Sequence, residues 1–84
     1  MYKSLIKAYV ESITKSDIYT FATKENIEIT KEETDIIFNA IKNDTDIILS
    51  SDFPSYMKKY NNILSQTLIN KILEYYKKYE NFLS

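Results

Sequence analysis

Apolar residues recur at helical spacing along the first part of the chain. Between Tyr2 and Ile13 they follow the i, i+3, i+4, i+7 series that gathers side chains on one face of a helix. The pattern predicts a helix over residues 2–13 whose apolar face packs into a core. The residues of this face are Tyr2, Leu5, Ile6, Tyr9, Val10 and Ile13.

Capping signals divide the next segment into two further helices. Thr14 offers an N-cap hydroxyl, and Asp17, three residues later, can complete a short capping box. This helix is expected to end near Asn26, a residue that tolerates the left-handed conformation common at helix ends. Thr30 and Glu33 form a full T-x-x-E capping box, which opens a third helix. The apolar residues of that third helix are Ile36, Ile37, Phe38, Ala40 and Ile41.

Short connectors are expected on both sides of the third helix. The alternation in Ile27–Ile29 predicts an extended piece whose two isoleucines both point into the core. Residues 42–46 form a polar, turn-forming cluster. Residues 46–52 fit either a short buried extended piece or a helical turn, and the sequence leaves both alternatives open.

The C-terminal third is predicted to contain two more helices. Pro54 favours the first turn of a helix, so one should begin near this residue. Its core-facing residues are Tyr56, Met57, Tyr60 and Leu64. Ser65 can cap a last helix from about Gln66 to Leu83, whose apolar residues cover roughly half of the circumference. This helix is therefore either central in the bundle or partly directed at a partner.

These elements predict an all-α fold for the chain. With 84 residues, the length fits a single domain over residues 1–84. We expect a compact bundle of about five short helices with one or two short extended connectors.

The segment Asp17–Ile37, DIYTFATKENIEITKEETDII, carries a family pattern. Phe21–Ala22 matches the aromatic–alanine pair of this pattern, Ile27–Thr30 matches its bridge and helix cap, and Ile37 matches its closing apolar position. In these positions the chain resembles a small uncharacterised family of low-GC Gram-positive bacteria, the Bacillus YqfT type, a domain of unknown function. Thr34 stands where that family usually has alanine. The resemblance implies an all-helical fold and a bacterial cytoplasmic protein, and it implies no activity.

The composition excludes most routes to catalysis. The chain contains no histidine, cysteine or glycine, so the commonest general base, the strongest nucleophile and glycine-rich phosphate loops are all missing. Glu32, Glu33 and Asp35 lie in the first turns of the third helix, where acidic residues stabilise the helix start. Asp44 and Asp46 resemble the start of a calcium loop, but its glycine and bidentate glutamate are missing. We therefore expect that the protein is not an enzyme and that it binds no cofactor, metal or small-molecule substrate.

The sequence also predicts a cytoplasmic protein without a membrane segment. Lys3, Lys7 and Glu11 interrupt the N-terminal apolar pattern, which excludes the apolar region of a signal peptide. The longest aliphatic run is only Ile47–Leu49. The lack of cysteine removes any disulfide framework.

The charges are distributed unevenly. Residues 1–53 contain six lysines and ten acidic residues, a charge of −4, whereas residues 54–84 contain five lysines and two acidic residues, a charge of +3. A basic C-terminal third could bind nucleic acid, because phosphate contacts need a cationic surface. The chain has no arginine, however, and residues 17–42 are acidic. Nucleic-acid binding is therefore an unlikely alternative rather than the main prediction.

Protein interaction is the function that the sequence favours. On the wheel of the last helix, Tyr75 and Phe82 lie at one margin of the apolar arc, and Lys71 and Lys78 lie just beyond them. Tyrosine bordered by lysine is common in interfaces, because its ring is buried while its hydroxyl stays in water. We predict a non-enzymatic interaction module that either forms a homodimer through this helix or binds a larger partner.

Overall fold

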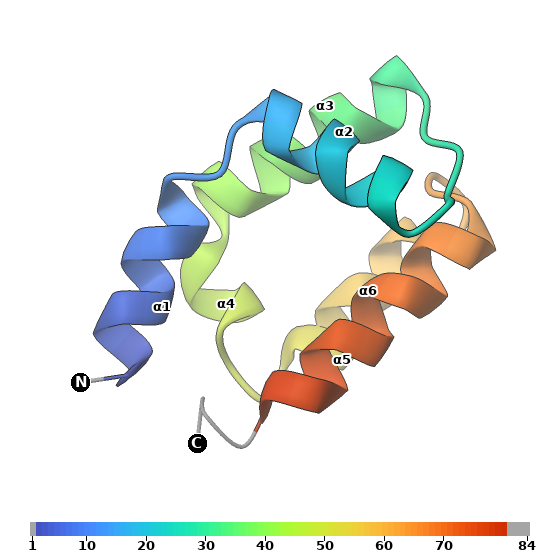
Figure 1. Ribbon diagram of the computed structural model, residues 1–84. Helices are drawn as coiled ribbons and strands as arrows, with labels where there is room; N and C mark the ends of the chain where they lie inside the picture. Colours follow the sequence, from blue (N-terminus) through green and yellow to red (C-terminus); the bar gives the residue numbers. More distant parts are fainter. Residues whose placement is uncertain (1, 81–84) are drawn as a thin grey trace.

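Helices form the regular structure of the computed structural model, which describes residues 2–80. They are α1 Tyr2–Glu11, α2 Lys15–Lys24, α3 Lys31–Asn43, α4 Thr45–Ile48, α5 Phe53–Met57, the 3-10 helix η1 Lys58–Tyr60 and α6 Gln66–Tyr79. Between residues 2 and 80 there is no strand, and the predicted all-α class is confirmed. In Figure 1, α1 and α6 lie on opposite sides of the molecule, with α4 between them.

The predicted start and end of α2 are both confirmed. The Thr14 hydroxyl accepts a 3.1 Å hydrogen bond from the Asp17 N–H, and the Thr14 N–H donates a 2.9 Å bond to the Asp17 carboxylate. Two residues after α2, Asn26 adopts a φ of 58°, in the left-handed region. This conformation reverses the chain and directs Ile27 into the core, where it is buried. Ile29 packs half-buried against the same core, as the alternation predicted.

The capping box of α3 is also present and has a second role. Glu33 accepts a 3.0 Å hydrogen bond from the Thr30 N–H through Oε1 and a 2.7 Å bond from the Ser65 N–H through Oε2. Ser65 is itself the N-cap of α6, because its hydroxyl accepts from the Leu68 N–H at 3.3 Å. One buried carboxylate therefore joins the start of α3 to the start of α6.

The core lies where α2 and the connector after it meet α5 and α6. Its buried members are Ala22, Ile27, Phe53, Met57, Leu64, Leu68 and Ile69. Leu68 and Ile69, from the first turn of α6, are among the least exposed side chains. None of the α1 side chains that the structure describes belongs to this core.

Two expectations about the middle of the chain need correction. Residues 45–48 form the short helix α4, which settles the open choice for this segment in favour of a helical turn. The helix near Pro54 begins at Phe53 and ends with η1 at Tyr60, so it does not continue to Leu64. Residues 61–64 form a turn, in which the Ile63 and Leu64 N–H groups both donate to the Tyr60 carbonyl, and the extended Ser65 then caps α6. The described part of the chain therefore has six α-helices instead of about five.

Helix α1 differs most from its prediction. It ends at Glu11, and Leu5 and Tyr9, which were expected in the core, are 65% and 70% exposed. Ile6 and Val10 are half-buried. The reason is that, among the described elements, α1 packs mainly against α3 and α4. Its apolar stripe is wider than the surface that these two helices cover.

Within residues 2–80, every helix is too short or too polar to cross a lipid bilayer.

Candidate functional site

The residues assigned to an interface from the sequence lie along one side of α6, next to the end of α2. The Tyr75 ring packs edge-on against Phe21, with centroids 5.2 Å apart. Its hydroxyl donates a 2.7 Å hydrogen bond to Glu25 Oε2. Lys78 Nζ lies 5.6 Å from the centroid of the Tyr75 ring. Phe82, the fourth residue of the predicted interface, lies outside the described residues.

Glu25 is the centre of a charged cluster between α2 and α6. Lys71 Nζ lies 3.5 Å from Glu25 Oε1 and 3.3 Å from Glu74 Oε2. The pKa of Glu25 is lowered, mainly by the hydrogen bond that Tyr75 donates to this carboxylate. The positive charge of Lys71 also lowers this pKa, whereas partial burial opposes the shift. Glu74, and then Glu25, raise the pKa of Lys71. The cluster therefore connects α6 to α2 through groups that stay charged at neutral pH.

A depression of about 440 Å³ lies beside this cluster. Its lining residues are Glu25, Glu74, Tyr75, Lys77 and Lys78. Carboxylates and lysines alternate around it, and Lys77 and Lys78 are exposed. A partner that docked here would meet mostly charged groups, which is typical of the rim of an interface and not of its centre.

A different surface exposes apolar groups. We call Ser4, Leu5, Ala8, Tyr9 and Ser12 the outer face of α1; all five are exposed. This face carries no charge, and its two large side chains, Leu5 and Tyr9, are one turn apart and 65% and 70% exposed. Such a surface can bury apolar area against a protein partner.

Sequence reasoning missed the outer face of α1, although one signal pointed to it. An amphipathic surface helix usually carries its charges opposite its apolar stripe. In α1, Lys7 and Glu11 lie one turn apart at the edge of the stripe, and the side opposite the half-buried Val10 carries Ala8 and serines. The lack of charged residues on that side is the sequence signal for the outer face of α1.

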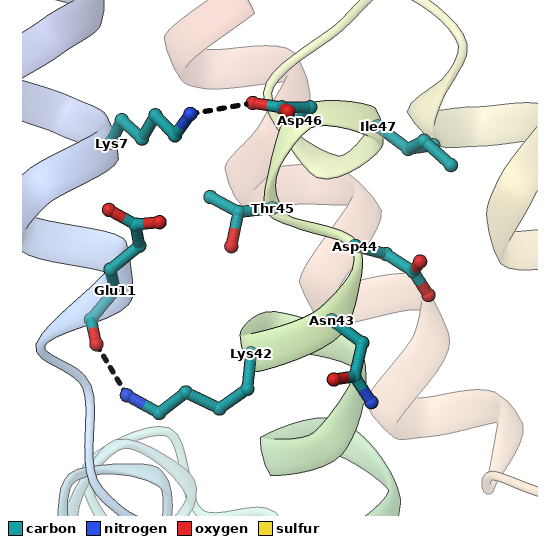
Figure 2. A pocket seen from close by; sticks show the side chains of 8 residues that line it. All are labelled: Lys7, Glu11, Lys42, Asn43, Asp44, Thr45, Asp46 and Ile47. Atoms are coloured by element: carbon teal, nitrogen blue, oxygen red, sulfur yellow. Dashed lines mark hydrogen bonds and ion pairs between the residues drawn. The ribbon is translucent and has the colours of Figure 1, made fainter.

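The inner edge of α1 is held by polar contacts around a second depression, of about 400 Å³ (Figure 2). Lys7 reaches from α1 to Asp46 of α4, with 2.9 Å between Nζ and Oδ1. This contact raises the pKa of Lys7. Lys42, at the end of α3, donates a hydrogen bond to the backbone carbonyl of Glu11. Because these contacts are exposed to solvent, they hold α1 only weakly.

Asp44 and Asp46, which were compared with a calcium loop, have separate partners. In Figure 2 the Asp44 carboxylate points away from that of Asp46. Asp44 Oδ2 accepts a 2.7 Å hydrogen bond from the Tyr56 hydroxyl, which lies 3.0 Å from the Tyr60 hydroxyl. Burial, and then these two hydrogen bonds, raise the pKa of Tyr56. Across residues 2–80 no three acidic side chains gather as metal ligands would.

The acidic residues at the start of α3 also have structural partners. Glu33 binds the two backbone N–H groups described above. Asp35 pairs with Lys15 of α2 at 3.0 Å. Glu32 is exposed in the first turn, where a negative charge favours the helix start.

Comparison with known proteins identifies a family but no activity. A family model described as a protein of unknown function, DUF2624, matches residues 1–80. No curated protein and no solved structure matches the chain.

Proposed function

The chain belongs to the DUF2624 family of proteins of unknown function, and we propose that it is a non-enzymatic helical module that binds another protein through the outer face of α1. One observation carries this proposal. Leu5 and Tyr9 are 65% and 70% exposed on a helix face that has no charged side chain. Covering these side chains would remove apolar surface from water, which is the main favourable term in protein association.

The weak attachment of α1 supports the same proposal. The described side chains of α1 are absent from the buried core, so the helix has little role in building that core. An amphipathic helix that leaves half of its stripe exposed is suited to packing against a further element. Within residues 2–80, α1 packs mainly against α3 and α4, and its Ile6 and Val10 are half-buried.

The margin of α6 is a second candidate surface. Its residues are Lys71, Tyr75, Lys78 and Phe82, and it would serve either a homodimer or a larger partner. Lys71 and Tyr75 already bind Glu25 within the chain. A partner there would have to bind over an existing polar cluster, so this surface is placed second.

Nucleic-acid binding by the basic C-terminal third is the competing proposal. The exposed Lys77 and Lys78 near the end of α6 favour it. Lys71 argues against it, because its charge is paired with Glu25 and Glu74. Binding through lysine–phosphate contacts should weaken steeply between about 50 and 200 mM salt, whereas an apolar contact through α1 should hardly respond.

We further propose a cytoplasmic location and an origin in low-GC Gram-positive bacteria, in a protein of the Bacillus YqfT type. The resemblance in residues 17–37 supports this assignment.

The interaction can be tested by crosslinking in the cells that produce the protein. A photoreactive phenylalanine analogue replaces Tyr9, and a matched control carries it at Tyr19, an exposed tyrosine of α2. We expect the analogue at position 9 to form a specific protein adduct that position 19 does not form. Equal labelling at both positions, or no adduct at position 9, would contradict the proposal.

A further inference from the structure

We propose that α4 couples α1 to the tyrosine pair Tyr56 and Tyr60, so that the docking of α1 and the hydrogen bonds of this pair strengthen each other. This coupling is a property of the fold and is separate from the proposed binding role of α1. Helix α4 packs against α1, α3 and α5, and in Figure 1 it lies between α1 and α5.

Helix α4 is too short to hold its own position. Its four residues form about one turn, and a helix of this length is unstable without tertiary contacts. Within the described chain, its N-cap residue Asp44 makes no side-chain hydrogen bond to the start of the helix. The end of α4 is fixed, because Ile48 packs against the core and the following Leu49 is buried. The position of its start therefore depends on neighbouring elements.

Asp44 forms the corner between α3 and α4. Its N–H donates a 2.8 Å hydrogen bond to the Ala40 carbonyl, and its own carbonyl accepts a 3.0 Å bond from the Ile48 N–H. Its φ of −125° and ψ of 32° break the direction of the helix. The Asp44 side chain accepts a 2.7 Å bond from the Tyr56 hydroxyl, which lies 3.0 Å from that of Tyr60. The tyrosine pair therefore holds this corner against α5 and η1.

Helix α1 contacts α4 close to the same corner. Two residues after Asp44, the Asp46 carboxylate lies 2.9 Å from Lys7 Nζ of α1, and it points away from the Asp44 carboxylate (Figure 2). The Asp46 side chain is 85% exposed, so this ion pair is weak by itself. The rest of the docking comes from packing of α1 against α3 and α4. A movement of the corner therefore changes the surface on which α1 docks.

The two sets of contacts favour the same position of α4. The described side chains of α1 are outside the buried core, so α1 can open while the core stays closed. With α1 docked, the start of α4 lies where Asp44 reaches Tyr56. Loss of the tyrosine bond should loosen α1, and release of α1 should disturb the tyrosine pair, because coupling between two equilibria is reciprocal.

Hydrogen exchange with two matched variants tests the first direction. Tyr56→Phe removes the hydroxyl bond to Asp44. Tyr75→Phe, the control, removes a hydroxyl–carboxylate bond of the same length, 2.7 Å, which joins α6 to α2. We expect Tyr56→Phe to lower the protection of the α1 amides roughly two- to tenfold, the range for moderate coupling, and Tyr75→Phe to leave it unchanged. The amides of Leu68 and Ile69 report in both variants that the core remains folded. Unchanged α1 protection in Tyr56→Phe, or an equal loss in both variants, would overturn the proposal.

The reverse direction is measured at the tyrosine pair. Lys7→Met removes the ion pair between α1 and α4 and keeps a long, unbranched side chain. Lys15→Met is the control, because it removes an exposed ion pair between α2 and α3 with a similar distance of 3.0 Å. We expect Lys7→Met to shift the ring NMR signals of Tyr56 and Tyr60 and Lys15→Met to leave them in place. Unmoved tyrosine signals in Lys7→Met would contradict the coupling.

Combining the two substitutions separates coupling from independent effects. Because each contact strengthens the other, the second substitution should matter less once the first is present. Lys7→Met with Tyr56→Phe should therefore lower the protection of the α1 amides by less than the product of the two single effects. A double variant whose loss equals that product would show that the contacts on the two sides of α4 act independently, and the proposal would be wrong.

Discussion

The buried carboxylate of Glu33 accepts hydrogen bonds from two backbone N–H groups, those of Thr30 and Ser65, at 3.0 and 2.7 Å. A carboxylate out of water needs such partners, because burial of an unpaired charge is costly. Glu33 therefore does more than complete a capping box. It links the start of α3 to the start of α6.

Glu33→Gln is predicted to destabilise the protein by about 1–3 kcal/mol, the range for disrupting a hydrogen bond to a charged, buried group. An amide keeps one acceptor for the Thr30 N–H, but it directs N–H₂ toward the Ser65 N–H. Urea unfolding measures the loss. Glu32→Gln, at an exposed neighbouring position, should change stability by less than about 0.5 kcal/mol. Equal effects of the two substitutions would show that the link to Ser65 contributes nothing.

Tyr75 controls the ionisation of Glu25. Its hydrogen bond is the largest cause that lowers the pKa of this carboxyl. Tyr75→Phe should therefore raise the pKa of Glu25 toward its ordinary value, as measured by carbon-13 NMR during a pH titration. Tyr19→Phe, at an exposed position of α2, is the control and should leave this pKa unchanged. No change in the pKa of Glu25 in Tyr75→Phe would contradict the contact.

The lowered pKa of Glu25 also predicts a pH dependence of stability. A carboxyl whose pKa is lower in the folded chain than in the unfolded chain stabilises the fold above its unfolded pKa. This contribution is lost as the pH falls through the folded pKa. Stability should therefore fall less between neutral and acidic pH in Tyr75→Phe than in the unmodified chain, as followed by urea unfolding at each pH.

At the scale of the helices, α1 stands apart from the other long elements. Residues of α2, α5 and α6 belong to the buried core and residues of α3 pack against it, whereas the described side chains of α1 do neither. Its inner edge depends on exposed contacts such as Lys7–Asp46. Few buried contacts mean that α1 can open locally at a lower free energy than the whole fold.

Hydrogen exchange measures this difference. The amides of α1 should exchange at a lower opening free energy than those of Leu68 and Ile69 in α6, which are buried in the core. Equal protection of α1 and α6 would show that α1 is an integral part of the core.

The helix starts could be predicted from the sequence because their partners are local. Thr14 and Asp17, like Thr30 and Glu33, lie three residues apart and form their bonds within one turn. The all-α class followed from these caps and from helical spacing. The helix near Pro54 ended earlier than predicted, because residues 61–64 form a turn that closes on the Tyr60 carbonyl.

The surfaces could not be predicted in the same way, because they depend on packing between distant segments. The contact between Tyr75 and Glu25 joins residues 50 positions apart, and the contact between Glu33 and Ser65 joins residues 32 apart. The sequence placed Tyr75 at the margin of the last helix, but it could not show the Glu25 cluster against which Tyr75 packs. It also placed Leu5 in the core, since the spacing of apolar residues does not tell how many neighbours a helix has.

For the whole molecule, the two ends of the chain provide different surfaces. The α6 margin is charged and already engaged with α2, whereas the outer face of α1 is uncharged and exposed. Because α1 and α6 lie on opposite sides of the molecule (Figure 1), a partner bound through α1 would leave the α6 margin accessible.

Photocrosslinking from α1 tests the binding role of its outer face most directly. In the cells that produce the protein, a photoreactive phenylalanine analogue at position 9 should form a specific protein adduct, because Tyr9 is 70% exposed on this face. The same analogue at Tyr19, an exposed residue of α2, should not form this adduct. Equal labelling at the two positions, or no adduct at position 9, would contradict binding through α1.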